Sequence, residues 1–278
     1  MVLSARSQDL GVANLDDFAK TLTDYGYNGV QLVPHKTFSD VACFPTHRQA
    51  QSISAQLQNF NVQVVLVGAY FNPVHPNKEK VKFGKANFLE YIKLARDLGG
   101  DTVGSETGSY NGDKWTYNPL NRTPEALKCV VDTFVELCKS AAQYGVNVGI
   151  EGAAGHCLYN LETLKKGYQR IVNRLEKQNL FIIFDLFNML DSDNAKYHMT
   201  IAQCALELFE GKICCFHIKD CTFKNGEVRQ VRPGAGELNL KAYLKMIKEY
   251  DKDAKLVLEG VTGSDIVPAL DFVKNAIQ

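Results

Sequence analysis

The chain has 278 residues, and its 31 basic and 31 acidic side chains give a formal net charge of zero. A zero balance argues against nucleic-acid binding through bulk positive charge. Apolar residues make up 45% of the chain, and no apolar run approaches the roughly 18 residues that a membrane span needs. We therefore expect a globular protein with neither a nucleic-acid nor a membrane partner. The length allows one domain or two.

The N-terminal segment and the cysteines indicate the compartment. Residues 1–6 lack the basic flank and apolar stretch of a signal peptide. The chain has eight Cys, and none of them forms a CxxC pair. These features predict a cytoplasmic protein whose thiols are free and mostly buried.

Short apolar strands alternate with longer helical segments along the whole chain. Strands are expected at residues 2–5, 29–33, 62–68, 102–106, 146–151, 180–185, 213–218 and 255–259. Helices are expected at residues 14–25, 46–60, 77–98, 123–144, 161–177, 200–209, 240–250 and 264–277. Asn14, Thr46, Thr123 and Asn160 are residue types that cap helix N-termini, and each stands at an expected start.

The eight strand–helix units define the fold class. Dividing 278 residues by eight gives about 35, the size of one such unit. The strands are almost continuously apolar, as expected when both faces of a parallel sheet are buried. No GxGxxG motif follows the first strand, so a dinucleotide-binding sheet has no support. The pattern predicts an α/β protein, a single (β/α)8 TIM barrel domain over residues 1–278.

The lengths of the connections predict where the functional site lies. Helix-to-strand connections are short, whereas strand-to-helix connections such as residues 107–122 and 219–239 are long. Long loops inside a compact domain are usually functional, and in a parallel barrel they gather at the C-terminal face. Within the second of these loops, residues 223–228 predict a small hairpin with an Asn-Gly turn.

Ligand-type residues end four consecutive strands. Glu151, Asp185, His217 and Glu259 stand at the ends of the fifth to eighth strands, with spacings of 34, 32 and 42 residues. Neighbouring strand ends would place the four around one point at the barrel rim. Three carboxylates so close would repel each other unless a cation lay between them. The set suits one divalent ion, Mn²⁺ first, with Mg²⁺, Co²⁺ or Zn²⁺ as alternatives.

Through these residues the chain resembles the xylose isomerase-like TIM barrel superfamily, specifically its sugar-phosphate isomerase/epimerase group related to tagatose 3-epimerase. The resemblance covers the full length and rests on five segments: residues 150–151, 184–188, 216–220, 233–237 and 258–260. It implies that Glu151, Asp185, His217 and Glu259 hold one divalent metal. It also implies that Glu151 and Glu259 form the catalytic acid–base pair.

This resemblance implies a proton-transfer reaction on a sugar or a sugar phosphate. Removal of a proton α to a carbonyl leaves an enediolate, whose charge a divalent ion stabilises. Glu151 and Glu259 on opposite sides of the sugar could remove the proton and return it. Return to the same carbon inverts that carbon, whereas return to its neighbour interconverts aldose and ketose. The residues leave both outcomes open, and a homodimer or homotetramer is left open as the assembly.

Further side chains are candidates for substrate contact because they lie near strand ends or in the long loops. They are Asn188, Arg232, His75, Glu106, Lys219 and Trp115. Asn188 stands where the family often has His. The loop after the fifth strand, residues 152–157, lacks the second glutamate of the tagatose-epimerase subgroup. Both differences weaken the case for a tagatose-like substrate and leave the metal ligands intact.

Three alternatives use the same scaffold. A metal-dependent polyol or inosose dehydratase would use the same metal and acid–base pair but would release water. An apurinic endonuclease needs a multi-zinc site and a surface that grips phosphates, and the chain has six His and no net charge. A non-catalytic sugar-binding protein would not require both Glu151 and Glu259.

Overall fold

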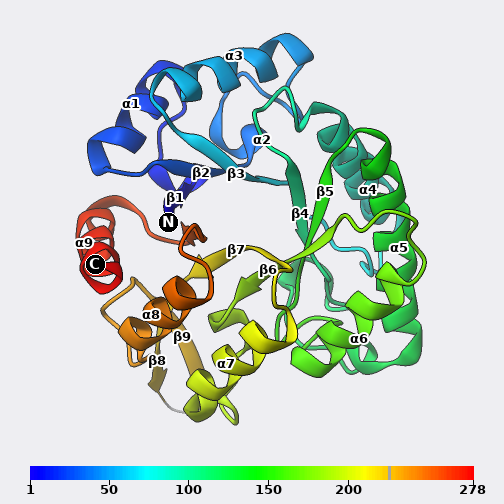
Figure 1. Ribbon diagram of the computed structural model, residues 1–278. Coiled ribbons are helices and arrows are strands. Elements are labelled where there is room, and N and C mark those ends of the chain that lie inside the picture. Colours follow the sequence, from blue (N-terminus) through cyan, green and yellow to red (C-terminus); the bar gives the residue numbers. More distant parts are fainter. Residues whose placement is uncertain (225–226) are drawn as a thin grey trace.

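The computed structural model describes residues 1–224 and 227–278. Eight parallel strands close into a barrel in the spatial order β1-β10-β7-β6-β5-β4-β3-β2, which confirms the predicted fold. They are β1 (Val2–Arg6), β2 (Gly29–Leu32), β3 (Gln63–Gly68), β4 (Thr102–Glu106), β5 (Asn147–Glu151), β6 (Leu180–Asp185), β7 (Ile213–Ile218) and β10 (Lys255–Leu258). Figure 1 shows these strands at the centre of the molecule, with the helices around them.

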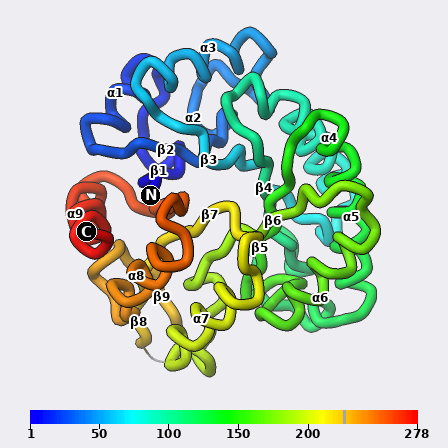
Figure 2. Tube along the Cα trace, viewed as in Figure 1, coloured from blue at the N-terminus to red at the C-terminus, as the bar shows by residue number. Residues whose placement is uncertain are grey.

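The long helices of the described chain form the outer layer. They are α1 (Leu15–Tyr25), α3 (His47–Asn59), α4 (Lys78–Leu94), α5 (Pro124–Gln143), α6 (Leu161–Val172), α7 (His198–Leu208), α8 (Leu240–Tyr250) and α9 (Ile266–Ile277). The single-turn helix α2 (Pro34–Thr37) lies in the loop after β2. The tube in Figure 2 follows the helices round the barrel in chain order until α9 meets α1.

The expected N-caps are confirmed. The side chain of Asn14 accepts from the backbone amides of Asp16 and Asp17, and Thr46 forms a capping box with Gln49. Thr123 and Asn160 likewise accept from amides in the first turns of α5 and α6. Such caps satisfy amides that have no partner inside the helix.

Several boundaries differ from the expectation by a few residues. Helix α6 ends at Val172 rather than at residue 177, because the amides of Arg174 and Leu175 bond the carbonyls three residues back instead of four. Helix α4 ends at Leu94 and continues as turns to Gly99, whose positive φ of 80° ends the helical path. Helix α7 starts two residues early, at His198. Strand β1 extends one residue further than expected, to Arg6.

A small apolar cluster fills the inside of the barrel. It consists of Val65, Leu66, Ile183, Cys215 and Val257, all almost fully buried. The interior is so tight that a Cβ on Gly104 would lie 2.5 Å from Cδ1 of Ile183. A side chain at position 104 of β4 would therefore have to displace the Ile183 side chain of β6.

A hairpin interrupts the loop between β7 and α8. Strands β8 (Asp220–Lys224) and β9 (Glu227–Val231) pair antiparallel, as the sequence predicts. The expected Asn-Gly turn at residues 225–226 lies outside the described residues. The hairpin is drawn at the lower edge of the barrel in Figure 1, beside α8.

Two further expectations concern the thiols and the membrane. All eight cysteines are free, as expected from the sequence. Within residues 1–224 and 227–278, no helix combines the length and apolar character that a bilayer crossing needs.

Candidate metal centre

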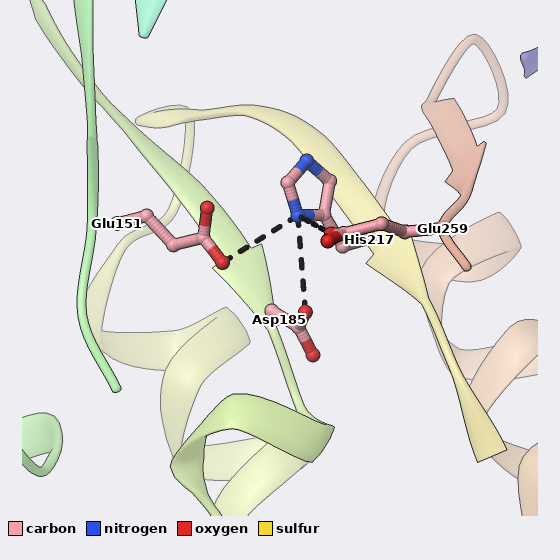
Figure 3. A group of neighbouring side chains, drawn as sticks. All are labelled: Glu151, Asp185, His217 and Glu259. Atoms are coloured by element: carbon pink, nitrogen blue, oxygen red, sulfur yellow. Dashed lines mark ion pairs between the residues drawn. The ribbon is translucent and has the colours of Figure 1, made fainter. Parts of the chain in front are cut away.

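The four predicted ligand residues meet at the C-terminal end of the barrel. Glu151 and Asp185 are the last residues of β5 and β6, His217 lies in β7, and Glu259 directly follows β10. One ligand atom from each lies within 4.8 Å of those from the other three. Figure 3 shows Glu151 and Glu259 approaching His217 from opposite sides, with Asp185 between them.

Strand geometry explains why these side chains point inward. Ile183, Cys215 and Val257 belong to the apolar cluster inside the barrel. Each stands two residues before a ligand residue of its own strand or strand end, and residues i and i+2 of a strand face the same side. The inward-facing apolar positions therefore place the next inward-facing positions, the ligands, directly above the filled interior.

Nδ1 of His217 is the centre of the cluster. It lies 2.9 Å from Glu259 Oε2, 3.5 Å from Glu151 Oε1 and 3.8 Å from Asp185 Oδ2. Nδ1 of His217 and Oδ2 of Asp185 are buried at charge-pair distances but make no hydrogen bond within the described residues. Buried polar atoms are normally satisfied. With His217 neutral, both atoms present lone pairs among the neighbouring carboxylates, and such a donor set fits a divalent cation.

The protonation energetics favour a positive charge at this point. Burial alone would lower the pKa of His217, but the carboxylates of Glu151 and Glu259 raise it well above its usual value. Burial raises the pKa of Asp185, and the nearby Glu151 adds to this effect. A divalent cation would replace the imidazolium proton as the compensating charge, because metal ligands bind deprotonated.

Lys219 and Asn188, both expected to contact substrate, touch the cluster. Nζ of Lys219 lies 2.8 Å from Asp185 Oδ2 and 3.2 Å from Glu259 Oε2. Burial would lower the pKa of Lys219, but the charges of Asp185 and Glu259 raise it above its usual value. The Asn188 side chain donates to Glu151 Oε1 at 2.7 Å, and its backbone amide donates to Asp185 Oδ1 at 3.0 Å.

Glu106 lies at the same end of the barrel. It is the last residue of β4 and pairs in register with Glu151 of β5. Burial, followed by the charges of Glu151 and Glu259, raises its pKa well above the usual value. Its carboxyl group is therefore protonated more readily than an exposed glutamate and can donate a hydrogen bond.

The other three candidates lie further out. His75 is buried; its Nδ1 accepts from the Asn77 amide at 2.9 Å, and its Nε2 lies 3.3 Å from Asp113. The Trp115 ring packs against that of His156, with the centroids 5.5 Å apart and the planes tilted by 54°. His75 and Trp115 line one cavity of about 360 Å³.

Arg232 faces a different neighbour. Its Nε lies 3.5 Å from Asp265, and another of its nitrogens donates to the Pro233 carbonyl at 3.3 Å. In the described part of the chain, neither His75, Trp115 nor Arg232 forms a hydrogen bond or ion pair with the four ligand residues.

The comparison with protein families identifies the fold family. The model of the xylose isomerase-like TIM barrel family matches residues 19–276. The chain belongs to this family. No functionally curated protein matches the sequence significantly.

Several solved structures share this xylose isomerase-like barrel. A D-tagatose 3-epimerase-like protein superposes with a TM-score of 0.74 at 19% identity, covering 100% of this chain and 97% of that chain. The IOLI protein, solved with a zinc atom, has a TM-score of 0.73 at 17% identity, covering 99% and 96%. AsbF of Bacillus anthracis, a probable 3-DHS dehydratase, has a TM-score of 0.73 at 12% identity, covering 100% and 99%. At these identities the likeness establishes the shared fold.

The first two strands and the loop after β3 of this xylose isomerase-like barrel bring three more side chains to the site. NH1 of Arg6 contacts Glu259 Oε1 at 2.5 Å. Gln31 contacts Nε2 of His217 and the hydroxyl of Tyr70. None of these three contacts was predicted from the sequence. Two signals were available in the sequence. Arg6 is a charged residue at the end of the first strand, and Gln31 is a polar residue inside the apolar second strand.

Proposed function

We propose that the chain is a divalent-metal-dependent isomerase or epimerase of a sugar. The observation that carries this proposal is the cluster of Glu151, Asp185, His217 and Glu259, in which two glutamates face each other across one point. Family membership and the epimerase-like structural neighbour support the same conclusion.

The donor set supports the nature of the cofactor. Three carboxylates and one imidazole suit Mn²⁺, with Mg²⁺, Co²⁺ and Zn²⁺ as alternatives. The IOLI structure, which shares this fold, was solved with a zinc atom, and this supports the proposal of a divalent ion here. When bound, the ion supplies positive charge that stabilises the negative charge developing on substrate oxygens.

Glu151 and Glu259 are the proposed acid–base pair. Asn188 orients Glu151 through a 2.7 Å hydrogen bond, whereas Glu259 is held between Arg6 and Lys219. One glutamate takes a proton from carbon on one face of the sugar, and the other returns a proton from the opposite face. Return to the same carbon is epimerisation, and return to the adjacent carbon is isomerisation.

The charges around the site favour a neutral sugar over a sugar phosphate. A phosphate needs cations that are free to bind it. Arg6 pairs with Asp9 and Glu259, and Lys219 pairs with Asp185 and Glu259. Two cations further out are also paired, Lys80 with Asp113 and Arg232 with Asp265.

The remaining candidates are proposed as substrate contacts. Asn188, Lys219 and Glu106 lie beside the ligands and would contact the oxygens nearest the reacting carbon. His75 and Trp115, which line a cavity together with Tyr70, would contact the far end of the sugar. Arg232, in the loop after the hairpin, would act at the rim.

Proton exchange tests the reaction. A panel of free and phosphorylated ketoses and aldoses is incubated in D₂O with Mn²⁺, and deuterium incorporation α to the carbonyl is followed by NMR. Exchange is expected for a free sugar and should stop with a chelator. Glu151→Gln and Glu259→Gln should each reduce the exchange rate by about 10²-fold or more, with metal occupancy measured alongside. Glu136→Gln, at an exposed glutamate paired with Lys85, is the matched control.

The same experiment separates the main alternative. A metal-dependent dehydratase would use the same residues, and the AsbF neighbour supports keeping it as the second candidate. Mass spectrometry distinguishes the two reactions, because an isomer has the mass of its substrate. A product that has lost one water would overturn the isomerase proposal, and unchanged exchange in both glutamate variants would overturn the acid–base pair.

A further inference from the structure

Gln31 is a polar side chain sealed inside the barrel. It lies in β2, whose four residues are all buried, and its own exposed fraction is 0%. Its Oε1 lies 2.8 Å from Nε2 of His217, and its Nε2 donates to the Tyr70 hydroxyl at 2.8 Å. Both ends of the amide are thus satisfied, and one of them contacts a residue of the metal centre.

The amide of Gln31 lies with its nitrogen toward Tyr70 and its oxygen toward His217. Because the NH₂ group of Gln31 faces Tyr70, its carbonyl oxygen faces His217 and can only accept a hydrogen bond. Nε2 of His217 must therefore carry the hydrogen. The opposite ring nitrogen, Nδ1, is the one that faces the three carboxylates.

The reverse orientation would disable the site. An NH₂ group against Nε2 would require a lone pair there, so the hydrogen of a neutral imidazole would sit on Nδ1. A hydrogen on Nδ1 would occupy the direction in which a metal would bind. In the structure the amide nitrogen donates to the Tyr70 hydroxyl, and that hydroxyl, which can donate or accept, holds the far end of the amide in place.

We infer that Gln31 is a positioning residue of the metal centre, which holds the His217 ring with Nδ1 presented as the ligand atom. The inference rests on the proposed metal site. Partners that accept the second ring hydrogen of a metal-binding histidine typically contribute 10–100-fold to metal affinity. Gln31 would be that partner, and Tyr70, which follows β3, would hold its amide in place.

Metal affinity of three variants tests the inference. The dissociation constant for Mn²⁺ is measured by EPR of the free ion. Gln31→Met keeps the length of the side chain but accepts no hydrogen bond, and is expected to weaken binding about 10–100-fold. Gln31→Asn, whose oxygen falls short, should weaken binding as well. Gln31→Glu keeps an acceptor for Nε2–H and should bind Mn²⁺ within about threefold of wild type or more tightly. Gln63→Met, at the exposed start of neighbouring β3, is the matched control.

A second readout needs no metal. The hydrogen on Nε2 of His217 is buried and hydrogen-bonded, so its NMR signal should be protected from exchange with water in the metal-free protein. His217→Gln assigns the signal by removing it. The signal should be lost or exchange rapidly in Gln31→Met and Gln31→Asn, and should persist in Gln31→Glu.

The outcomes separate this inference from the proposed function. Wild-type protein that binds no Mn²⁺ would overturn the metal site and the inference together. Wild-type binding with unchanged affinity in folded Gln31→Met or Gln31→Asn would overturn the role of Gln31 alone. Equal losses in the Met and Glu variants would also overturn it, because they would indicate a packing role rather than a hydrogen-bonding one.

Discussion

Lys219 lies among the carboxylates without belonging to the ligand set. Its ammonium group is buried and contacts both Asp185 and Glu259. Removing one charge from a cluster of buried charges leaves its partners uncompensated. This costs more free energy of unfolding than the loss of an exposed ion pair. Lys219 therefore stabilises the clustered carboxylates before any metal binds.

Lys219→Met should destabilise the metal-free protein. We expect the free energy of unfolding in chelator to fall by about 3 kcal/mol, because Asp185 and Glu259 lose their nearest cation. Because the pKa of Lys219 is raised, the wild-type ammonium group stays charged throughout the neutral and mildly alkaline range. The loss should therefore persist from neutral to mildly alkaline pH. Urea unfolding at each pH measures it.

The control for this change is an exposed lysine. Lys128→Met breaks a surface pair with Asp132 and should cost less than about 1 kcal/mol. If Lys219→Met unfolds at the same urea concentration as wild type in chelator, Lys219 does not compensate the carboxylates.

At the scale of elements, one carboxylate organises the loop after β7. Oδ2 of Asp220 accepts from the amides of Gly234 and Gly236, and Oδ1 accepts from those of Cys221 and Leu238. A Cβ on Gly236 would lie 2.1 Å from Asp220 Oδ1, so the loop fits closely around the carboxylate. Backbone amides that would otherwise bind an external anion are thus used internally.

Asp220→Ala should loosen this loop. Four amides would lose a charged acceptor, and we expect the free energy of unfolding to fall by about 2–4 kcal/mol. Hydrogen exchange should accelerate at Gly234, Gly236 and Leu238 while the amides of β5 and β6 remain protected. Asp24→Ala, at an exposed aspartate paired with Lys20, provides the comparison. Unchanged exchange at the three amides would mean that the loop is held by other contacts.

The element pattern also explains which parts of the site could be predicted. The ligands end consecutive strands, so one rule of parallel barrels places Glu151, Asp185 and His217 side by side. Gln31 and Arg6 lie 186 and 253 residues from their partners His217 and Glu259. Those contacts exist only because β1 pairs with both β2 and β10, which closes the barrel. Closure was expected, but the register and side-chain direction that create these contacts depend on packing.

For the molecule as a whole, metal binding should be coupled to folding. The ligands come from β5, β6, β7 and the end of β10, which are far apart in the unfolded chain. A ligand that binds only the folded state stabilises it by about 2.7 kcal/mol at a hundred times its dissociation constant. For a chain of this length, each kcal/mol corresponds to roughly 2–4 °C in Tm.

Metal addition should therefore raise the Tm of chelator-treated protein. We expect an increase of roughly 5–10 °C at a hundred times the dissociation constant, measured by calorimetry. Titrating Mn²⁺, Mg²⁺, Co²⁺ and Zn²⁺ separately ranks the metals by the concentration at which the shift begins. Asp185→Asn removes one charged ligand and should abolish most of the shift, while Asp253→Asn, at an exposed turn, should leave it intact. An equal shift in Asp185→Asn would mean that the stabilising ion binds elsewhere on the barrel.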